Sequence, residues 1–259
     1  MMDAADLQRQ EEDFFQLFNK IMEQAEEKGI TLRVLGAIAF RIHCPKHKRL
    51  HYELGRELSD IDFAGYLRDI EKIEELFLGM GYQQDEMVKR LFGTKRRIFF
   101  HPDKSIHSDV FIDKLRFCHE IDFQNRLELD YPTIPLVDML LEKMQIVQLT
   151  EKDIIDTIML LREHEVGASD NETVNSEYLA TLCSKDWGLW RTVTMNLEKT
   201  KNFLPQYDAL QHEDRRDVEE KIEKLLSDIE SKPKSLRWKM RAKIGDKVQW
   251  YRDVEEVTR

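Results

Sequence analysis

Hydrophobic residues recur along this chain with two different periods, which separate a mixed first half from a helical second half. Between residues 6 and 28 the apolar side chains follow helical spacing, and Gly29 is expected to end that helix. The apolar positions are Phe14, Leu17, Phe18, Ile21 and Met22. The stripe predicts a helix that packs its aromatic face against a sheet.

Short apolar runs between turn residues predict strands in the first half of the chain. Residues 31–35 are typical of a strand, Gly36 of a turn, and residues 38–42 of the start of a helix. A second strand is expected over residues 61–66, and a helix with its own apolar stripe over residues 68–79. This alternation predicts a small sheet flanked by helices.

A β-hairpin is expected next. Residues 96–101 and 107–113 are β-like runs, and the segment Pro102-Asp103-Lys104-Ser105 between them is typical of a turn. Because side chains alternate along a strand, Asp109 is expected on the face opposite to Val110. The hairpin therefore presents a carboxylate on one of its two faces.

The second half of the chain has helical periodicity from Pro135 onward. The segments with this period are residues 136–149, 176–197 and 214–231. Thr150 is predicted to begin a further helix through a capping box with Asp153, and residues 167–175 are predicted to form a polar linker. The C-terminal region is therefore expected to be all-helical.

The predicted fold class is α+β, with a small mixed β-sheet flanked by helices and an all-helical C-terminal region behind it. The length of 259 residues suits one large domain or two ordinary ones. The change of pattern predicts a first domain over residues 1–130, which includes the N-terminal helix, and a helical domain over residues 131–259.

Composition and charge narrow the functional classes. The net charge of -10 argues against a generic nucleic-acid binder, although a local basic patch is compatible with it. The three cysteines are widely spaced and predict neither a zinc pair nor a disulfide framework. The acidic start is unlike a signal peptide, and no apolar run is long enough to span a bilayer. We expect a soluble cytoplasmic protein with no membrane partner.

Two carboxylates one residue apart are the main candidate for chemistry. In a strand, Asp60 and Asp62 lie on the same face while Ile61 turns into the core. Like charges held that close repel each other, and a hard divalent cation with carboxylate ligands relieves the repulsion. Asp109 on the hairpin is the candidate third acid. The alternative interpretation is a turn, because Ser-Asp pairs often open loops and cap helices.

These motifs together resemble the nucleotidyltransferase superfamily. Gly36-Ala37, then Ser59-Asp60-Ile61-Asp62, then a lone strand aspartate at Asp109 look closest to the minimal nucleotidyltransferases and the AbiEii-like branch of abortive-infection toxins. The match covers residues 31–113, and residues 135–156 are similar to the helical stretch behind the sheet in that branch. The resemblance implies a nucleotidyltransferase core with a small mixed sheet.

The resemblance also implies roles for particular residues. Asp60, Asp62 and Asp109 would be catalytic and would bind Mg²⁺, with Mn²⁺ as a substitute. The expected substrate-binding residues are Gly36, Ala37, Arg41, Ser59, Lys143 and Lys152, of which Arg41 is chosen for its place one turn into the helix after Gly36. The expected activity is transfer of a nucleoside monophosphate from a nucleoside triphosphate to an acceptor.

The resemblance leaves the acceptor and the biological role open. It implies an RNA end such as that of a tRNA, a protein or a small molecule as acceptor, and a toxin restrained by an antitoxin partner. Ala37 and Ile38 replace the second glycine and the serine of the family pattern. This departure keeps open a catalytically inactive relative that acts as a nucleotide-sensing or protein-interaction module.

Three groups of basic residues each have two interpretations. The basic residues at positions 46–49 and Arg56 either grip phosphate or form a solvated loop. Arg96 or Arg97 either steadies phosphate beside Asp109 or makes a cross-strand charge pair. The basic and aromatic residues of the tail from Leu236 to Val257 either bind single-stranded nucleic acid or belong to an amphipathic helix that closes a core.

Overall fold

The computed structural model describes residues 4–102 and 106–254, which form two compact units. The first unit runs to residue 42 and includes residues 55–115 and 122–135, and the second includes residues 43–54, 116–121 and the chain from residue 136 onward. The sequence predicted a single boundary at residue 130. It therefore placed residues 43–54 and 116–121 in the first domain, whereas the structure groups both segments with the second unit. The chain is mixed α/β in its described part.

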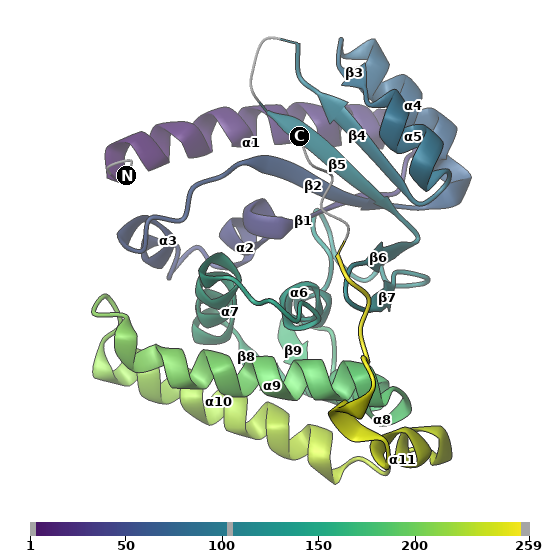
Figure 1. Cartoon of the computed structure of the whole chain (residues 1–259). Coiled ribbons are helices and arrows are strands. Elements are labelled where there is room, and N and C mark those ends of the chain that lie inside the picture. Colours follow the sequence, from purple (N-terminus) through teal and green to yellow (C-terminus); the bar gives the residue numbers. More distant parts are fainter. Residues whose placement is uncertain (1–3, 103–105, 255–259) are drawn as a thin grey trace. The chain divides into compact units, whose positions relative to one another are not determined.

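A five-stranded mixed sheet forms the centre of the first unit (Figure 1). Its spatial order is β1 (Leu32–Leu35), β2 (Asp60–Gly65), β5 (His107–Ile112), β4 (Arg96–Phe100) and β3 (Gln83–Gln84). β2 and β5 are parallel, and the other neighbouring pairs are antiparallel. The predicted strands and the antiparallel pairing of the hairpin are confirmed, while residues 103–105 of its predicted turn lie outside the described residues.

Both edges of this sheet are closed or short. On the outer side of β1, the amide of Val34 donates to the carbonyl of Pro132 at 3.0 Å, and Val34 forms an isolated parallel bridge with Thr133. The opposite edge strand, β3, is only two residues long. Few backbone groups of the sheet therefore face outward along its edges.

Helices cover one face of the sheet through an aromatic core. The helices of this unit are α1 (Ala4–Glu27), α2 (Gly36–His43), η1 (Leu67–Asp69), α4 (Ile70–Gly79) and α5 (Glu86–Phe92). Phe77 of α4 stacks on Phe99 of β4 at 4.3 Å between ring centroids and meets Phe63 of β2 edge-on at 6.2 Å. On the same face, Arg97 donates to Glu74 of α4 at 2.5 Å. These contacts leave the opposite face of β2 and β5 for other side chains.

The second unit is mainly helical, and α8, α9 and α10 lie side by side in it (Figure 1). Its helices are α3 (Arg49–Glu53), α6 (Leu136–Met144), α7 (Glu151–Glu163), α8 (Ser176–Lys185), α9 (Trp187–Phe203), η2 (Leu204–Gln206), α10 (His212–Ser231), α11 (Leu236–Ala242) and η3 (Gly245–Lys247). β6 (Lys114–Arg116) and β7 (Glu120–Asp122) form a separate two-stranded sheet. Among the described residues, no helix combines the length and the apolar character needed to cross a bilayer.

One prediction for the C-terminal region is wrong. It is not all-helical, because β8 (Glu165–Gly167) and β9 (Thr173–Asn175) pair in parallel across part of the expected linker. The segment with helical period at residues 176–197 contains two helices, which meet at Asp186, whose carboxylate accepts from the amides at the start of α9. The predicted capping box of Thr150 and Asp153 at the start of α7 is confirmed.

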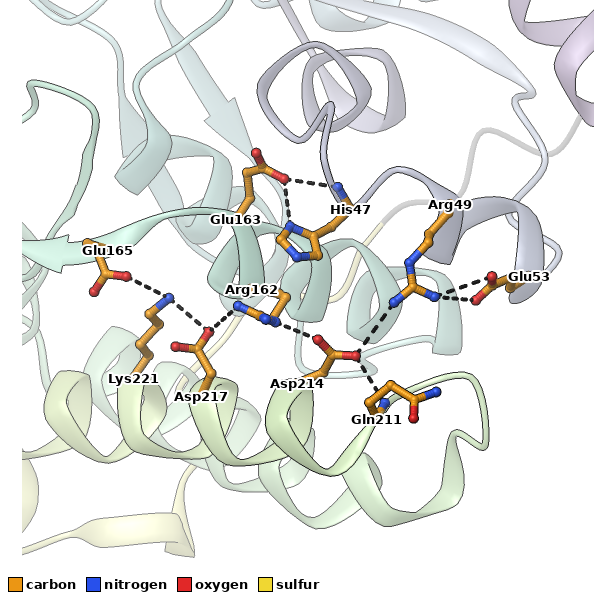
Figure 2. Close-up of polar contacts among 10 residues, drawn as sticks. All are labelled: His47, Arg49, Glu53, Arg162, Glu163, Glu165, Gln211, Asp214, Asp217 and Lys221. Carbon is orange, nitrogen blue, oxygen red and sulfur yellow. Dashed lines mark hydrogen bonds and ion pairs between the residues drawn. The ribbon is translucent and has the colours of Figure 1, made fainter.

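Ion pairs explain why residues 43–54 belong to the second unit (Figure 2). The backbone amide of His47 donates to Glu163 at 3.0 Å, and its Nδ1 lies 2.7 Å from the same carboxylate. Arg49 pairs with Asp214 of α10 at 3.7 Å, and Arg162 of α7 donates to Asp214 at 2.6 Å. The basic segment at residues 46–49 is therefore partly neutralised by acids of its own unit.

A buried histidine gives the second unit a pH-dependent stability. His119 lies 2.8 Å from Thr192 Oγ1 through its Nε2. Burial lowers the pKa of His119 from 6.5 to about 4, with a smaller contribution of the same sign from Arg252 and an opposing one from Asp186. The folded chain therefore keeps this imidazole neutral at a pH where the unfolded chain protonates it.

We predict that His119→Gln weakens the pH dependence of stability. Between about pH 6.5 and 4 the unfolded state binds more protons, so the wild-type free energy of unfolding falls as the pH falls, and between pH 7 and 5 this histidine accounts for about 2 kcal/mol. Urea unfolding at both pH values measures the difference. Equal pH dependence in wild type and variant would contradict the prediction.

Candidate functional site

The three predicted acids lie on the same face of the central sheet. Asp62 of β2 is the register partner of Asp109 of β5, and Asp60 is the partner of His107. Neighbouring strands are about 4.8 Å apart, so the side chains of register partners lie next to each other. Three carboxylates and one imidazole therefore share one surface of two parallel strands.

The alternation of buried side chains produces this arrangement. Ile61 and Phe63 are fully buried on the face covered by α4, and the alternate positions Asp60 and Asp62 turn to the other face. On β5, Val110 is likewise fully buried and Asp109 has the opposite orientation. A one-residue slip of either strand would put carboxylates into the aromatic core, so the register is strongly specified.

Gly36 lies directly against this surface. It follows Leu35, which is the register partner of Asp62, and it begins α2 with a φ of +68°. A Cβ at this position would lie 2.8 Å from Asp62 Oδ2, a distance that requires something to shift. The backbone conformation and the close approach both require glycine here. Ala37 is buried in the first turn of α2, and the hydroxyl of Ser59 donates to Asp60 at 3.1 Å.

Arg96 of β4 already provides a cation beside these acids. Its Nε donates to both carboxylate oxygens of Asp109 at 2.9 Å, and its Nη2 makes a further short contact with Oδ2. Its guanidinium also lies 5.2 Å from the ring centroid of Phe111. The Asp109 side chain is only 4% exposed and that of Arg96 18%, so water screens the pair weakly.

The charges of the acids act on Arg96 together. Burial lowers the pKa of the Arg96 guanidinium, but the hydrogen bonds and charge of Asp109 and the charges of Asp62 and Asp60 outweigh it and raise that pKa above its ordinary value. Arg96 therefore acts as the counter-ion of the whole acidic surface. The contact between Arg96 and Asp109 is the cross-strand charge pair that was one of the two interpretations of these arginines. Arg97 instead faces α4 and pairs with Glu74.

The donor set fits a divalent cation in part. Carboxylate oxygens suit Mg²⁺ and Mn²⁺, and the absence of a side chain at Gly36 lets the Asp62 carboxylate lie against the start of α2. Within residues 4–102 and 106–254, however, no group of three or more His, Cys, Asp or Glu side chains is placed to hold a metal ion. A cation at Asp109 would have to share that carboxylate with Arg96 or displace the guanidinium.

His107 also belongs to this surface, although the sequence favoured a surface histidine beside the hairpin turn over a ligand. Its Nε2 lies 3.6 Å from Asp60 Oδ2, and its side chain is 13% exposed. The signal was present, because His107 precedes Asp109 by two residues in the predicted strand and so shares its face. It adds an imidazole at the end of the site where Asp60 is 36% exposed.

Arg41 is occupied within the fold of the first unit. It is buried, its Nη1 donates to Glu11 of α1 at 2.9 Å, and its Nη2 donates to the carbonyl of Arg56 at 2.6 Å. These contacts tie α1 and the segment before β2 to α2. The predicted phosphate contact of Arg41 stays a prediction.

Lys143 and Lys152 belong to the second unit. Lys143 of α6 is buried, with its Nζ 3.0 Å from Asp156 and 3.5 Å from Asp153 of α7. His51 Nε2 lies 3.0 Å from the other oxygen of Asp156. Lys152 is exposed in the first turn of α7. The site on the sheet is therefore described from residues of the first unit alone.

Comparison of the chain with models of known protein families, with curated proteins and with solved structures found no match. The site must therefore be interpreted from its own chemistry. A surface with three carboxylates, one imidazole and one guanidinium can bind a cation, accept a proton or bind a phosphorylated ligand.

We predict that Gly36→Ala destabilises the first unit more than Gly29→Ala. Both glycines have left-handed φ values, +68° and +61°, but a Cβ at Gly29 meets nothing within 4 Å. The backbone cost of about 1 kcal/mol is therefore common to both variants, and Gly36→Ala adds the clash with Asp62. Chemical unfolding measures both, and equal losses would show that the close approach to Asp62 is unimportant.

We predict that Arg96→Gln increases the affinity of the acidic surface for Mn²⁺. The variant removes the guanidinium that occupies Asp109 and leaves the carboxylates in place. The matched control is Arg97→Gln, which removes a neighbouring positive charge from the other face of the same strand. Titration by electron paramagnetic resonance should give at least tenfold tighter binding for Arg96→Gln only. Unchanged binding in Arg96→Gln would contradict the counter-ion role.

Proposed function

We propose that the first unit is a divalent-cation-dependent nucleotidyltransferase, which moves a nucleoside monophosphate from a nucleoside triphosphate to an acceptor. The observation that supports it most is the pairing of Asp62 with Asp109 on parallel strands, with Asp60 on the same face. The close approach of Gly36 to Asp62 adds a turn at which backbone can approach a ligand.

Each acid has a separate role in the proposal. Asp60 and Asp62 would hold Mg²⁺ or Mn²⁺, which when bound neutralises charge on the phosphates. Asp109, once released by Arg96, would help to hold a cation and accept the proton of the attacking hydroxyl. The hydroxyl oxygen then bonds to the α-phosphorus, the bond from that phosphorus to pyrophosphate breaks, and the proton passes to Asp109.

The nucleotide would approach the sheet at the start of α2. The first turn of a helix presents backbone N–H groups that favour anions, and α2 begins at Gly36 beside Asp62. Ala37 is small enough to keep this turn close to the phosphates, and the exposed hydroxyl of Ser59 supplies a further polar contact. Arg96, displaced from Asp109, would be the nearest cation for the triphosphate.

The resemblance extends the proposal to the acceptor and the biological setting. The acceptor would be an RNA end, a protein or a small molecule, and the protein would act as the toxin of a toxin–antitoxin pair. These parts rest on the family pattern and not on the chemistry of the acidic surface.

A second candidate function is favoured by Arg96. Because its guanidinium already neutralises Asp109, the chain can keep the acidic surface folded with no metal ion. Ala37 and Ile38 also remove the hydroxyl that the family pattern places at the phosphates. The alternative is therefore a catalytically inactive nucleotidyltransferase fold that senses nucleotides or binds a protein.

Labelled nucleoside triphosphates test the activity. With Mg²⁺, and with total RNA and cell protein as acceptors, we expect the wild type to transfer the α-phosphate label. Asp62→Asn should lose about 100-fold or more of the rate, since a lost cation ligand removes several kcal/mol of charge stabilisation. The matched control is Glu71→Gln, which removes an exposed carboxylate from α4. Equal transfer by wild type and Asp62→Asn would overturn the mechanism.

Calorimetry distinguishes the two candidates. Titration of the wild type with ATP, CTP, GTP and UTP in the presence of Mg²⁺ measures binding without requiring an acceptor. Binding without label transfer would favour the nucleotide-sensing module, and absence of both would contradict every nucleotide function proposed for this unit.

A further inference from the structure

All four tryptophans of the chain gather in one region of the second unit. They are Trp187, Trp190, Trp238 and Trp250. Trp187 lies 6.0 Å from Trp190 and 6.1 Å from Trp250 between ring centroids, and Trp190 lies 5.0 Å from Trp238. The proposed function uses none of them.

A cavity of about 390 Å³ opens among these rings. Its walls come from the start of α9, from α11 and from the segment after it, which are coloured green to yellow in Figure 1. The lining includes Trp187, Trp238 and Trp250, the basic residues Lys185, Arg237 and Arg241, and Asp186, whose carboxylate accepts from the amides of Gly188 and Leu189. The cavity therefore combines aromatic faces with positive charge.

The walls of this cavity are held in place by specific contacts. Arg241 stacks over Trp187 at 4.5 Å and donates to the carbonyl of Val248 at 2.6 Å. The indole of Trp250 donates to Thr192 Oγ1 at 3.0 Å. The aromatic surfaces are thus preformed, and a planar ligand would not have to order them on binding.

Five cations of this region lack an ion-pair partner among the residues that the structure describes, and two of them, Lys185 and Arg237, line the cavity. The five are Lys185, Arg237, Lys239, Lys243 and Lys247, and all are exposed. Residues 232–252 contain eight Lys or Arg and a single acid, Asp246, which pairs with Arg191. The whole chain has 40 Lys and Arg against 50 Asp and Glu, so this segment is a local exception.

The core-closing interpretation of the tail does not hold for α11. None of its residues is buried, and Leu236 and Met240 are 75% and 55% exposed. The helix instead turns Trp238 and Arg241 inward to the tryptophans and presents its cations to solvent. It forms a wall of the cavity.

We propose that this aromatic cavity and the cations around it bind single-stranded nucleic acid. Unpaired bases can stack on Trp238 and Trp250, which are half-buried, whereas Trp187 is only 6% exposed and lies under Arg241. The exposed lysines and Arg237 neutralise successive phosphates. A duplex hides its base faces, and an acidic protein segment has no planar group to fill the cavity. This site is independent of the acidic surface of the first unit, and it stands whether or not that unit transfers nucleotides.

Intrinsic fluorescence tests the proposal in the unmodified full chain, because every tryptophan lies at the candidate site. Titration with a single-stranded uridine 12-mer at 50 mM salt should quench the emission. The affinity should fall as salt is raised, with a slope of about 0.7 per phosphate contact on logarithmic axes. Lack of quenching and of binding at 50 mM salt would overturn the proposal.

Charge variants on exposed positions avoid the risk of misfolding. The triple variant Lys239→Gln, Lys243→Gln and Lys247→Gln should bind at least tenfold more weakly, and its salt slope should be smaller by about 2. The matched control neutralises the exposed lysines Lys20, Lys28 and Lys72 of the first unit and should bind like the wild type. Equal weakening in both triple variants would show that only total charge matters.

Competitors separate stacking from simple attraction to anions. We expect neither polyglutamate nor a 12-base-pair duplex to displace the oligonucleotide at equal charge or to reproduce its quenching. Equal competition by polyglutamate would identify the surface as a site for acidic protein segments and would overturn the nucleic-acid assignment.

Discussion

The first unit depends on how two neighbouring strands accommodate like charges. Asp62 and Asp109 are register partners on parallel strands about 4.8 Å apart, and Asp60 shares their face. Carboxylates at this spacing repel each other unless a cation lies among them. The chain supplies one from the next strand, where Arg96 holds Asp109 with two hydrogen bonds of 2.9 Å. The opposite face can then hold an aromatic core, with the ring of Phe77 stacked on Phe99.

An internal cation and a bound metal ion are alternative solutions to the same electrostatic problem. With Arg96 in place, the sheet tolerates its acids without a ligand, which suits a protein that must fold before it meets a substrate. The same contact weakens metal binding at Asp109, because a divalent ion there must compete with the Arg96 guanidinium, whose charge is poorly screened by water. Of the two functions proposed above, an easy exchange would favour the nucleotidyltransferase and a difficult one the nucleotide-sensing module.

Local sequence patterns predicted the strands of the central sheet and the shared face of Asp60 and Asp62. This was possible because the alternation of side chains along a strand can be read from neighbouring residues alone. Which arginine would face Asp109 could not be predicted, because Arg96 and Arg97 differ only by the register of a hairpin whose turn does not specify it. Burial of Arg41 depends on Glu11, thirty positions away, and a helical period gives no sign of that partner. The pairing of β8 with β9 is equally non-local, and strands of three residues carry almost no periodicity.

The borders of the central sheet have a consequence for how the molecule behaves at high concentration. Exposed strand borders invite pairing with a second chain, and such pairing is a common route to aggregates. Here the segment at Pro132 and Thr133 shields the border at Val34, and the far border offers two residues, too short to template a neighbour. The acidic strands lie in the interior of the sheet, so intermolecular strand addition cannot reach them without first dismantling an outer strand.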